Sequence, residues 1–171
     1  MRNRSALIVA LALVATIAGP AVSPASAQNR VGGHMGFVLP LVSRANGTTT
    51  TIADDFVIGF PVGITVRKSD KFAFDLELVP NVQNDPLHVG LTVHPGVVAG
   101  LGNGWGAGMR IAFDVNEPQW GFTPILNHGL TTVGKDATLF GEIVVPIRFR
   151  SDRPGETTTS IGLGIHIGIG F

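Results

Sequence analysis

The sequence predicts an all-β protein, an eight-stranded antiparallel up-and-down transmembrane β-barrel. Three observations support this prediction. Residues 160–171 read SIGLGIHIGIGF, with a large apolar side chain at every odd position, as in a strand with one apolar face. Earlier segments alternate in the same way. After residue 27 no run of about 18 residues is continuously apolar, so any membrane crossing has to be made by strands that close into a barrel.

The N-terminal residues have the features of a secretory signal peptide. Arg2 and Arg4 precede an apolar run over residues 6–18, and Ala25-Ser26-Ala27 supplies a cleavage motif. The apolar run is too short to cross a bilayer, which takes about 20 residues. We therefore expect a signal peptide over residues 1–27 and a barrel domain over residues 28–171.

Eight segments of period-two alternation follow residue 27, and turn-forming residues separate them. They cover residues 31–42, 55–67, 72–81, 88–101, 105–116, 120–131, 137–150 and 158–171. Each is near or above the length of about 9–11 residues that a tilted strand needs to cross a bilayer. The connections are short, which favours antiparallel neighbours in chain order.

One choice of face in each strand separates the large apolar side chains from the charged ones. A charge that faces lipid near the midplane costs roughly 2–4 kcal/mol, so we assign the charged face to the lumen. We expect an ion-paired network there, made of Glu77, His94, Arg110, Asp114, Glu142, Arg148 and Arg150. A sharper hypothesis is that Arg110 exchanges between Glu77 and Glu142 and so gates a thin water path.

The connections predict which end of the barrel is which. Residues 68–71, 102–104 and 134–136 are short turns at one end, and residues 43–54, 82–87, 117–119 and 151–157 are modestly longer loops at the other. Transmembrane barrels carry aromatic girdles at both interfaces. We expect these belts at Phe72, Trp105 and Phe171 on the first rim, and at Phe56, Trp120 and Phe149 on the second.

Prolines argue against regular strands. Pro61, Pro95 and Pro124 fall in mid-strand, and Pro40, Pro80 and Pro146 fall in the upper thirds of their strands. A closed barrel has no edge on which a missing N–H is harmless. We expect β-bulges at these prolines. A bulge would reverse the two faces beyond it, so the strand register near each of them stays open.

The lumen also contains histidines and glycines. His34 and His166 lie on the first and last strands, and two imidazoles that converge can bind zinc or copper. No third ligand is identifiable, so we expect hydrogen-bonded histidines with no metal and no cofactor. The inward glycines either leave volume for long side chains or line a cavity, and we favour the first reading.

The closing strand, with its terminal Phe171 in phase with the apolar residues, resembles the last strand of bacterial outer-membrane β-barrels. Together with the signal peptide, it makes the chain similar to small barrels of OmpA-, OmpX- or OmpW-like architecture. The resemblance implies the outer membrane of a Gram-negative cell, with the bilayer and the barrel-assembly machinery as partners. It favours a non-enzymatic protein that is structural or weakly channel-forming. The protein would be porin-like only in forming such a weak channel.

Two other functions are considered. An outer-membrane lipid-modifying enzyme of the same strand number would, as in the known deacylase barrels, carry a His and a Ser close together on the lipid face, where only His128 is a candidate. A soluble periplasmic lipocalin-like ligand binder would need an apolar interior. A net charge of −2 after residue 27, from 10 basic and 12 acidic residues, does not suggest nucleic acid. The oligomeric state and any solute stay open.

Overall fold

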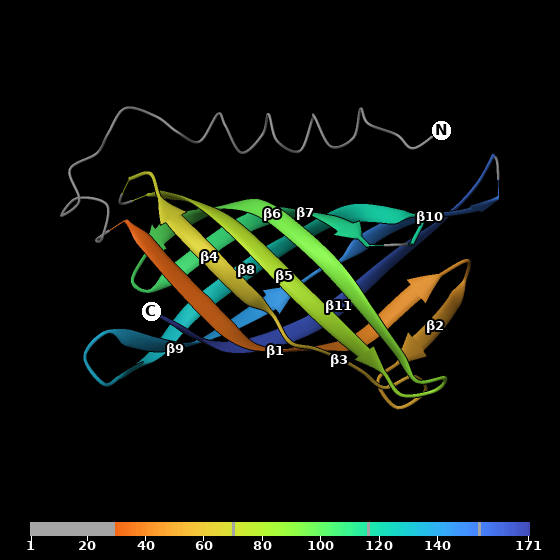
Figure 1. Ribbon diagram of the computed structural model, residues 1–171, viewed down its shortest axis with the longest axis horizontal. Helices are drawn as coiled ribbons and strands as arrows, with labels where there is room; N and C mark the ends of the chain where they lie inside the picture. Colours follow the sequence, from red (N-terminus) through yellow and green to blue (C-terminus); the bar gives the residue numbers. More distant parts are fainter. Residues whose placement is uncertain (1–29, 70, 116, 154) are drawn as a thin grey trace, which may run out of the picture. The chain divides into compact units, whose positions relative to one another are not determined.

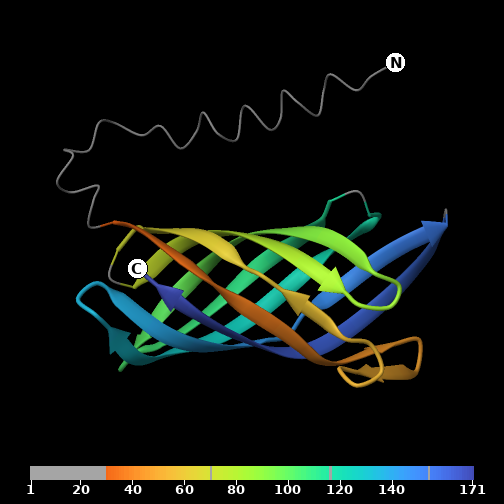
Figure 2. The same cartoon turned by 60° about the horizontal axis from the view of Figure 1, so that its bottom comes forward.

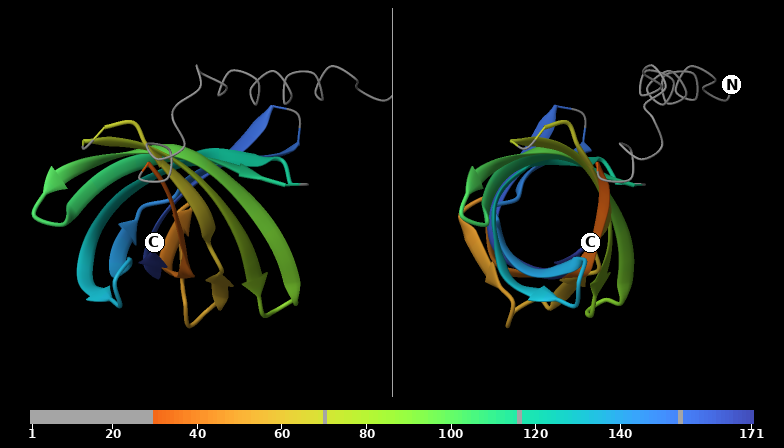
Figure 3. Two further views of the ribbon diagram at one scale, coloured as in Figure 1. Left: turned by 60° about the vertical axis from the view of Figure 1, so that its left-hand side comes forward. Right: turned by 90° about the vertical axis from the view of Figure 1, so that its left-hand side faces the viewer.

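The computed structural model describes residues 30–171 apart from residues 70, 116 and 154. The predicted signal peptide, residues 1–27, lies outside the described residues. From residue 31 onward the chain forms a single antiparallel sheet, and the sheet closes because its first and last strands pair with each other (Figure 3). In the described part of the chain, no helix is long and apolar enough to cross a membrane.

The sheet is an up-and-down barrel in which chain neighbours are also spatial neighbours (Figures 1 and 2). Its strands are β1 (Val31–Ala45), β2 (Thr48–Thr51), β3 (Val57–Gly59), β4 (Val62–Arg67), β5 (Phe72–Gln83), β6 (His88–Gly102), β7 (Trp105–Asp114), β8 (Gln119–Val133), β9 (Ala137–Val144), β10 (Ile147–Arg153) and β11 (Glu156–Gly170). β3 and β4 follow one line, as do β9 and β10, because each pair shares the same two neighbouring strands. With β2 outside the ring, the fold is the predicted eight-stranded antiparallel barrel.

One expected loop is partly strand. β1 continues to Ala45, and β2 folds back on it as a hairpin. Asn46 and Gly47 form the turn with φ values of 50° and 81°, the positive angles that the Asn-Gly pair adopts in a tight hairpin turn. The hairpin ends near Asp54, where hydrogen bonds from the hydroxyl and backbone N–H of Thr51 lower the pKa of the Asp54 carboxyl.

The expectation of a bulge is confirmed at Pro40, where the pairing of β1 with β11 shifts register between residues 40 and 42. It is wrong at Pro61, Pro95 and Pro124, because pairing keeps one register on both sides of these three prolines. The other shifts lie between residues 100 and 102, 129 and 131, and 150 and 153. Each missing N–H removes one ladder hydrogen bond, but the carbonyl can still accept one. The Pro61 carbonyl accepts from Gly36 N at 3.1 Å and the Pro124 carbonyl from Val145 N at 3.0 Å. Among the prolines of the described strands, the strand is interrupted at Pro61 and Pro146.

The two faces of the barrel differ sharply in polarity. On β5, Phe74 is 59% exposed and Asp75 4%, and the alternation continues through the apolar Leu76 and Leu78 against the buried Glu77. The same contrast on β11 separates exposed Ile165 from buried His166. The large hydrophobic side chains are therefore outside and the buried charges inside, the reverse of a water-soluble protein.

Aromatic side chains occupy both ends of the strands. Phe72, Trp105 and Phe171 lie around one opening of the lumen and are each about half exposed or more. Toward the other end, Trp120 and Phe149 pack together with 4.9 Å between ring centroids, and Phe56 is 47% exposed just before β3.

Candidate functional site

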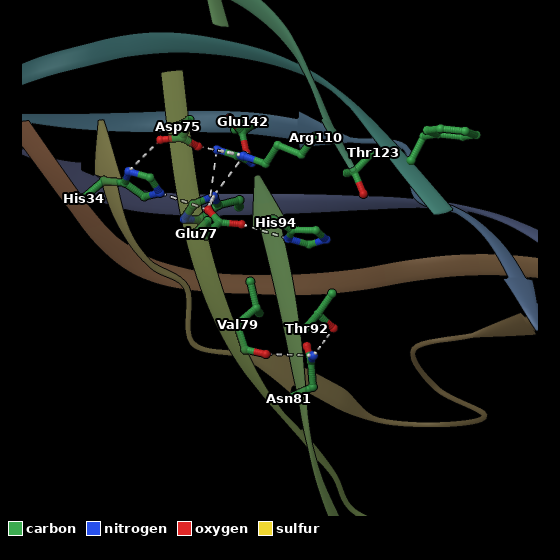
Figure 4. A network of polar contacts seen from close by, with 12 residues as sticks. His34, Asp75, Glu77, Val79, Asn81, Thr92, His94, Arg110, Thr123 and Glu142 are labelled. Atoms are coloured by element: carbon green, nitrogen blue, oxygen red, sulfur yellow. Dashed lines mark hydrogen bonds and ion pairs between the residues drawn. The ribbon is translucent and has the colours of Figure 1, made fainter. Parts of the chain in front are cut away.

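The strand register brings charged residues from distant parts of the chain to one level of the lumen. His34, Gly63, Glu77 and His94 are successive pairing partners across β1, β4, β5 and β6. In the other direction around the ring, β11 follows β1, and its His166 pairs with Glu142 on β9. Alternation points these polar side chains inward, and Figure 4 shows His34, Glu77, His94 and Glu142 in one group. His166 joins them through its contact with Glu142.

Arg110 is the centre of this group. We call the plug the set made of Arg110, the carboxylates of Asp75, Glu77 and Glu142, and the imidazoles of His34, His94 and His166. Its Nε donates to Asp75 at 2.9 Å and its Nη1 to Glu142 at 2.8 Å, while Nη2 lies 3.5 Å from Glu77. The guanidinium and all three carboxylates are buried. Buried charges are stable only when they are paired, and here one guanidinium faces three carboxylates.

Three histidines complete the plug. His166 Nδ1 lies 3.2 Å from Glu142, and His34 Nε2 lies 3.0 Å from Glu77. His94 lies between Glu77, 3.2 Å from Nδ1, and Arg148, 3.2 Å from Nε2. An arginine can only donate, so Nε2 of His94 must accept, and its Nδ1–H donates to Glu77.

The remaining residues of the predicted lumen network lie farther along the barrel. Arg148 reaches the plug through His94 and also donates to the Phe122 carbonyl and the Thr123 hydroxyl. Asp114 accepts from Thr92 and Gln119. Arg150 lies at the rim, where it pairs with Glu117 at 3.5 Å.

Sequence reasoning left three plug residues out of the predicted network. Alternation places Asp75, His34 and His166 on the charged, inward face, but nothing in the sequence says that they reach Arg110 or its carboxylates. Alternation gives the direction in which a side chain points, but not its height, by which we mean its position along the barrel axis. The heights follow only from the register of β1, β4, β5 and β11.

The plug lies between two cavities. One, of about 370 Å³, extends toward His88 and Arg150, and the other, of about 510 Å³, extends toward Lys71 and Phe171. The two linings share only Arg110 and Glu142. The ion pair between these two side chains therefore marks the point where the two halves of the lumen meet.

The inward glycines make room for the plug. His34 lies across its pairing partner Gly63, and a Cβ on Gly63 would be 2.1 Å from the imidazole. Arg110 lies across its partner Gly96 in the same way, with 2.7 Å from such a Cβ to its Cγ. Other pairs repeat the arrangement: Asn127 over Gly106, Val144 over Gly164 and Phe140 over Gly168. These glycines therefore leave volume for large side chains, as predicted. The side chains that fill this volume come from the neighbouring strand.

Gly63→Ala should destabilise the barrel by roughly 1–3 kcal/mol, because overpacking a filled site forces the buried His34 ring away from Glu77. Gly90→Ala is the matched control. Gly90 is also an inward strand glycine, but the nearest atom to its Cβ would be His88 Nε2 at 3.7 Å, an ordinary contact. Unfolding by urea in detergent micelles would measure both, and equal stabilities of the two variants would contradict this packing.

No family model matches the chain, and no curated protein matches it. Among solved structures, the chain is similar to the outer membrane protein OprG from Pseudomonas aeruginosa, with 11% identity and a TM-score of 0.43, covering 82% of this chain and 94% of that one. The pairing of β1 with β11, which closes the sheet, defines the barrel fold.

Proposed function

We propose that this chain is an integral outer-membrane β-barrel protein, structural or weakly channel-forming, with an ion-paired lumen. The observation that carries the proposal is the inverted polarity of the barrel. A soluble protein rarely leaves a contiguous apolar patch beyond a few hundred Å², whereas here exposed Phe, Leu, Ile and Val side chains follow one face of strand after strand. Such a surface is favourable against lipid.

Export and assembly fit the same proposal. Residues 1–27 would direct secretion, and β11 with Phe171 would be read by the barrel-assembly machinery. The last strand is well placed for this role, because its backbone pairing with β1 closes the ring up to the hydrogen bonds between Phe171 and Gly33. The two sets of rim aromatics would then lie at the two membrane interfaces.

The plug argues against an open pore. Eight strands enclose a space that side chains can fill, and Arg110 with Glu142 occupies the meeting point of the two cavities. Arg110 already contacts Glu77 as well as Glu142, so a small displacement could exchange its strongest partner. We propose that this exchange, with Asp75 as a third partner, gates a thin water path.

The two alternatives are less consistent with the geometry. A lipocalin-like binder would carry its apolar side chains inside, where this lumen holds charges. For a lipid-modifying enzyme, His128 is the candidate base, but its ring stacks on Trp105 with centroids 4.4 Å apart. Nucleophilic catalysis needs a hydroxyl within hydrogen-bond reach of such a base.

We expect the purified mature chain to migrate differently on SDS gels before and after boiling, because a closed barrel exposes no free edge to the detergent. In fractionated cells the protein should sediment with the outer membrane.

In planar bilayers the protein should be silent or show only small conductance. A large steady conductance would contradict the closed plug, and a detergent-free soluble protein with one gel mobility would contradict the membrane barrel. Lipid deacylation or acyl transfer by the purified chain would favour the enzyme instead.

A further inference from the structure

The plug contains a set of side chains that resembles a metal-binding site. One ligand atom from each of His34, Asp75 and Glu77 can be chosen such that all three lie within 4.8 Å of one another. The three residues are 7%, 4% and 3% exposed. An imidazole nitrogen with two carboxylate oxygens is a donor set that suits zinc and related divalent ions.

The charge of the plug favours an added cation. Asp75, Glu77 and Glu142 all pair with Arg110, so three carboxylates share a single guanidinium. A divalent cation between His34, Asp75 and Glu77 would offset the excess. Arg110 need not lose its pairing when this happens, because its Nη1 keeps Glu142 at 2.8 Å.

A further imidazole lies beside Glu77 and His34. His166 is only 1% exposed, its Nδ1 is 4.0 Å from Glu77, and its ring centroid is 6.1 Å from that of His34. Its Nε2 is buried without a hydrogen-bond partner among the described residues. Such an unsatisfied buried atom is uncommon in a native structure and is accounted for if the ring turns to bind a ligand.

We propose that His34, Asp75 and Glu77, with His166 as the fourth ligand, bind one first-row divalent cation in the lumen. The ion would enter through the 510 Å³ cavity, which His34 and Asp75 both line. Thr65 supports the site from outside, because its hydroxyl donates to Asp75 at 2.8 Å and orients that carboxylate. The site is independent of whether the lumen conducts.

Zinc alone is the probe, titrated into the folded full barrel in detergent micelles against a chromophoric chelator. We expect one zinc ion per chain, and cobalt in its place should give the visible absorption of a low-coordinate nitrogen–oxygen site. His34→Gln should weaken zinc binding about tenfold or more, and Thr65→Val, which keeps every ligand, should weaken it by about tenfold. His88→Gln is the control, because His88 is an exposed histidine that pairs with Glu117 at the rim.

Heat-modifiable migration identifies the variants that fold. If His34→Gln does not fold, Thr65→Val and the cobalt spectrum of the parent still decide the question. Failure of the parent to bind one equivalent of zinc would overturn the proposal. So would loss of binding in His88→Gln with retention in Thr65→Val, because the ion would then be held at the rim.

Discussion

Replacing Arg110 with methionine should cost the barrel about 3–5 kcal/mol of unfolding free energy, the largest effect expected of any single lumenal change. Methionine is unbranched, uncharged and only slightly smaller in volume, so the substitution removes the guanidinium with little loss of volume. Asp75, Glu77 and Glu142 would then remain buried together without their shared partner. The same variant should conduct more than the parent in planar bilayers, because Arg110 lines both halves of the lumen.

Arg150→Met is the matched control for this experiment. Arg150 also points into the lumen and pairs with an acid, Glu117, but its side chain is 46% exposed at the rim. An exposed ion pair contributes about 0–1 kcal/mol, so the control should stay near the parent in stability. Urea titrations followed by the fluorescence of Trp105 and Trp120 would measure both variants. Equal losses in the two, or an Arg110 variant as stable as the parent, would show that the plug is not held together by Arg110.

The second large effect concerns the outer face. Leu76→Arg should impair folding into lipid vesicles by roughly 2–4 kcal/mol, because it places a charge in the hydrocarbon. Leu76 is 47% exposed on β5, between the plug residues Asp75 and Glu77, and so lies at the level of the plug. The measurement is the fraction of heat-modifiable protein on unboiled gels after folding into vesicles.

Leu87→Arg makes the same chemical change outside the strands. Leu87 is 77% exposed in the connection between β5 and β6, and an arginine there stays in water. The control should fold like the parent. If Leu76→Arg folded equally well, the outer face of β5 would not be in contact with lipid.

Much of the fold was predictable, because period-two alternation is a direct consequence of strand geometry. The contrast between Phe74 and Asp75 can be seen in the sequence, and it fixes both the strand and its faces. The Asn46-Gly47 pair was equally visible, and β2 was overlooked because Thr48–Thr51 has no apolar alternation to mark it as a strand. Such a hairpin is specified by its turn and not by burial.

The register was beyond the sequence, and the plug depends on it. Bulges were expected at Pro61 and Pro124 because a lost N–H was assumed to break the pairing, whereas the carbonyl of each proline still accepts a hydrogen bond. Asp75 lies only two residues from Glu77, yet its bond to Arg110 arises from the heights of β5 and β7 on the ring. Heights are set jointly by every strand pair around the barrel, and no local pattern records them.

The pairing of large inward side chains with glycines has a consequence for how this lumen can change during evolution. His34 and Gly63 share one volume, as do Arg110 and Gly96, so the glycine can gain a side chain only if its partner is replaced by a smaller residue. Accepted substitutions should therefore come in couples drawn from adjacent strands, and homologous barrels should show the two positions co-varying. A lumen with different polar groups would then evolve through paired substitutions, in which one residue becomes smaller as its partner becomes larger, and not through single replacements.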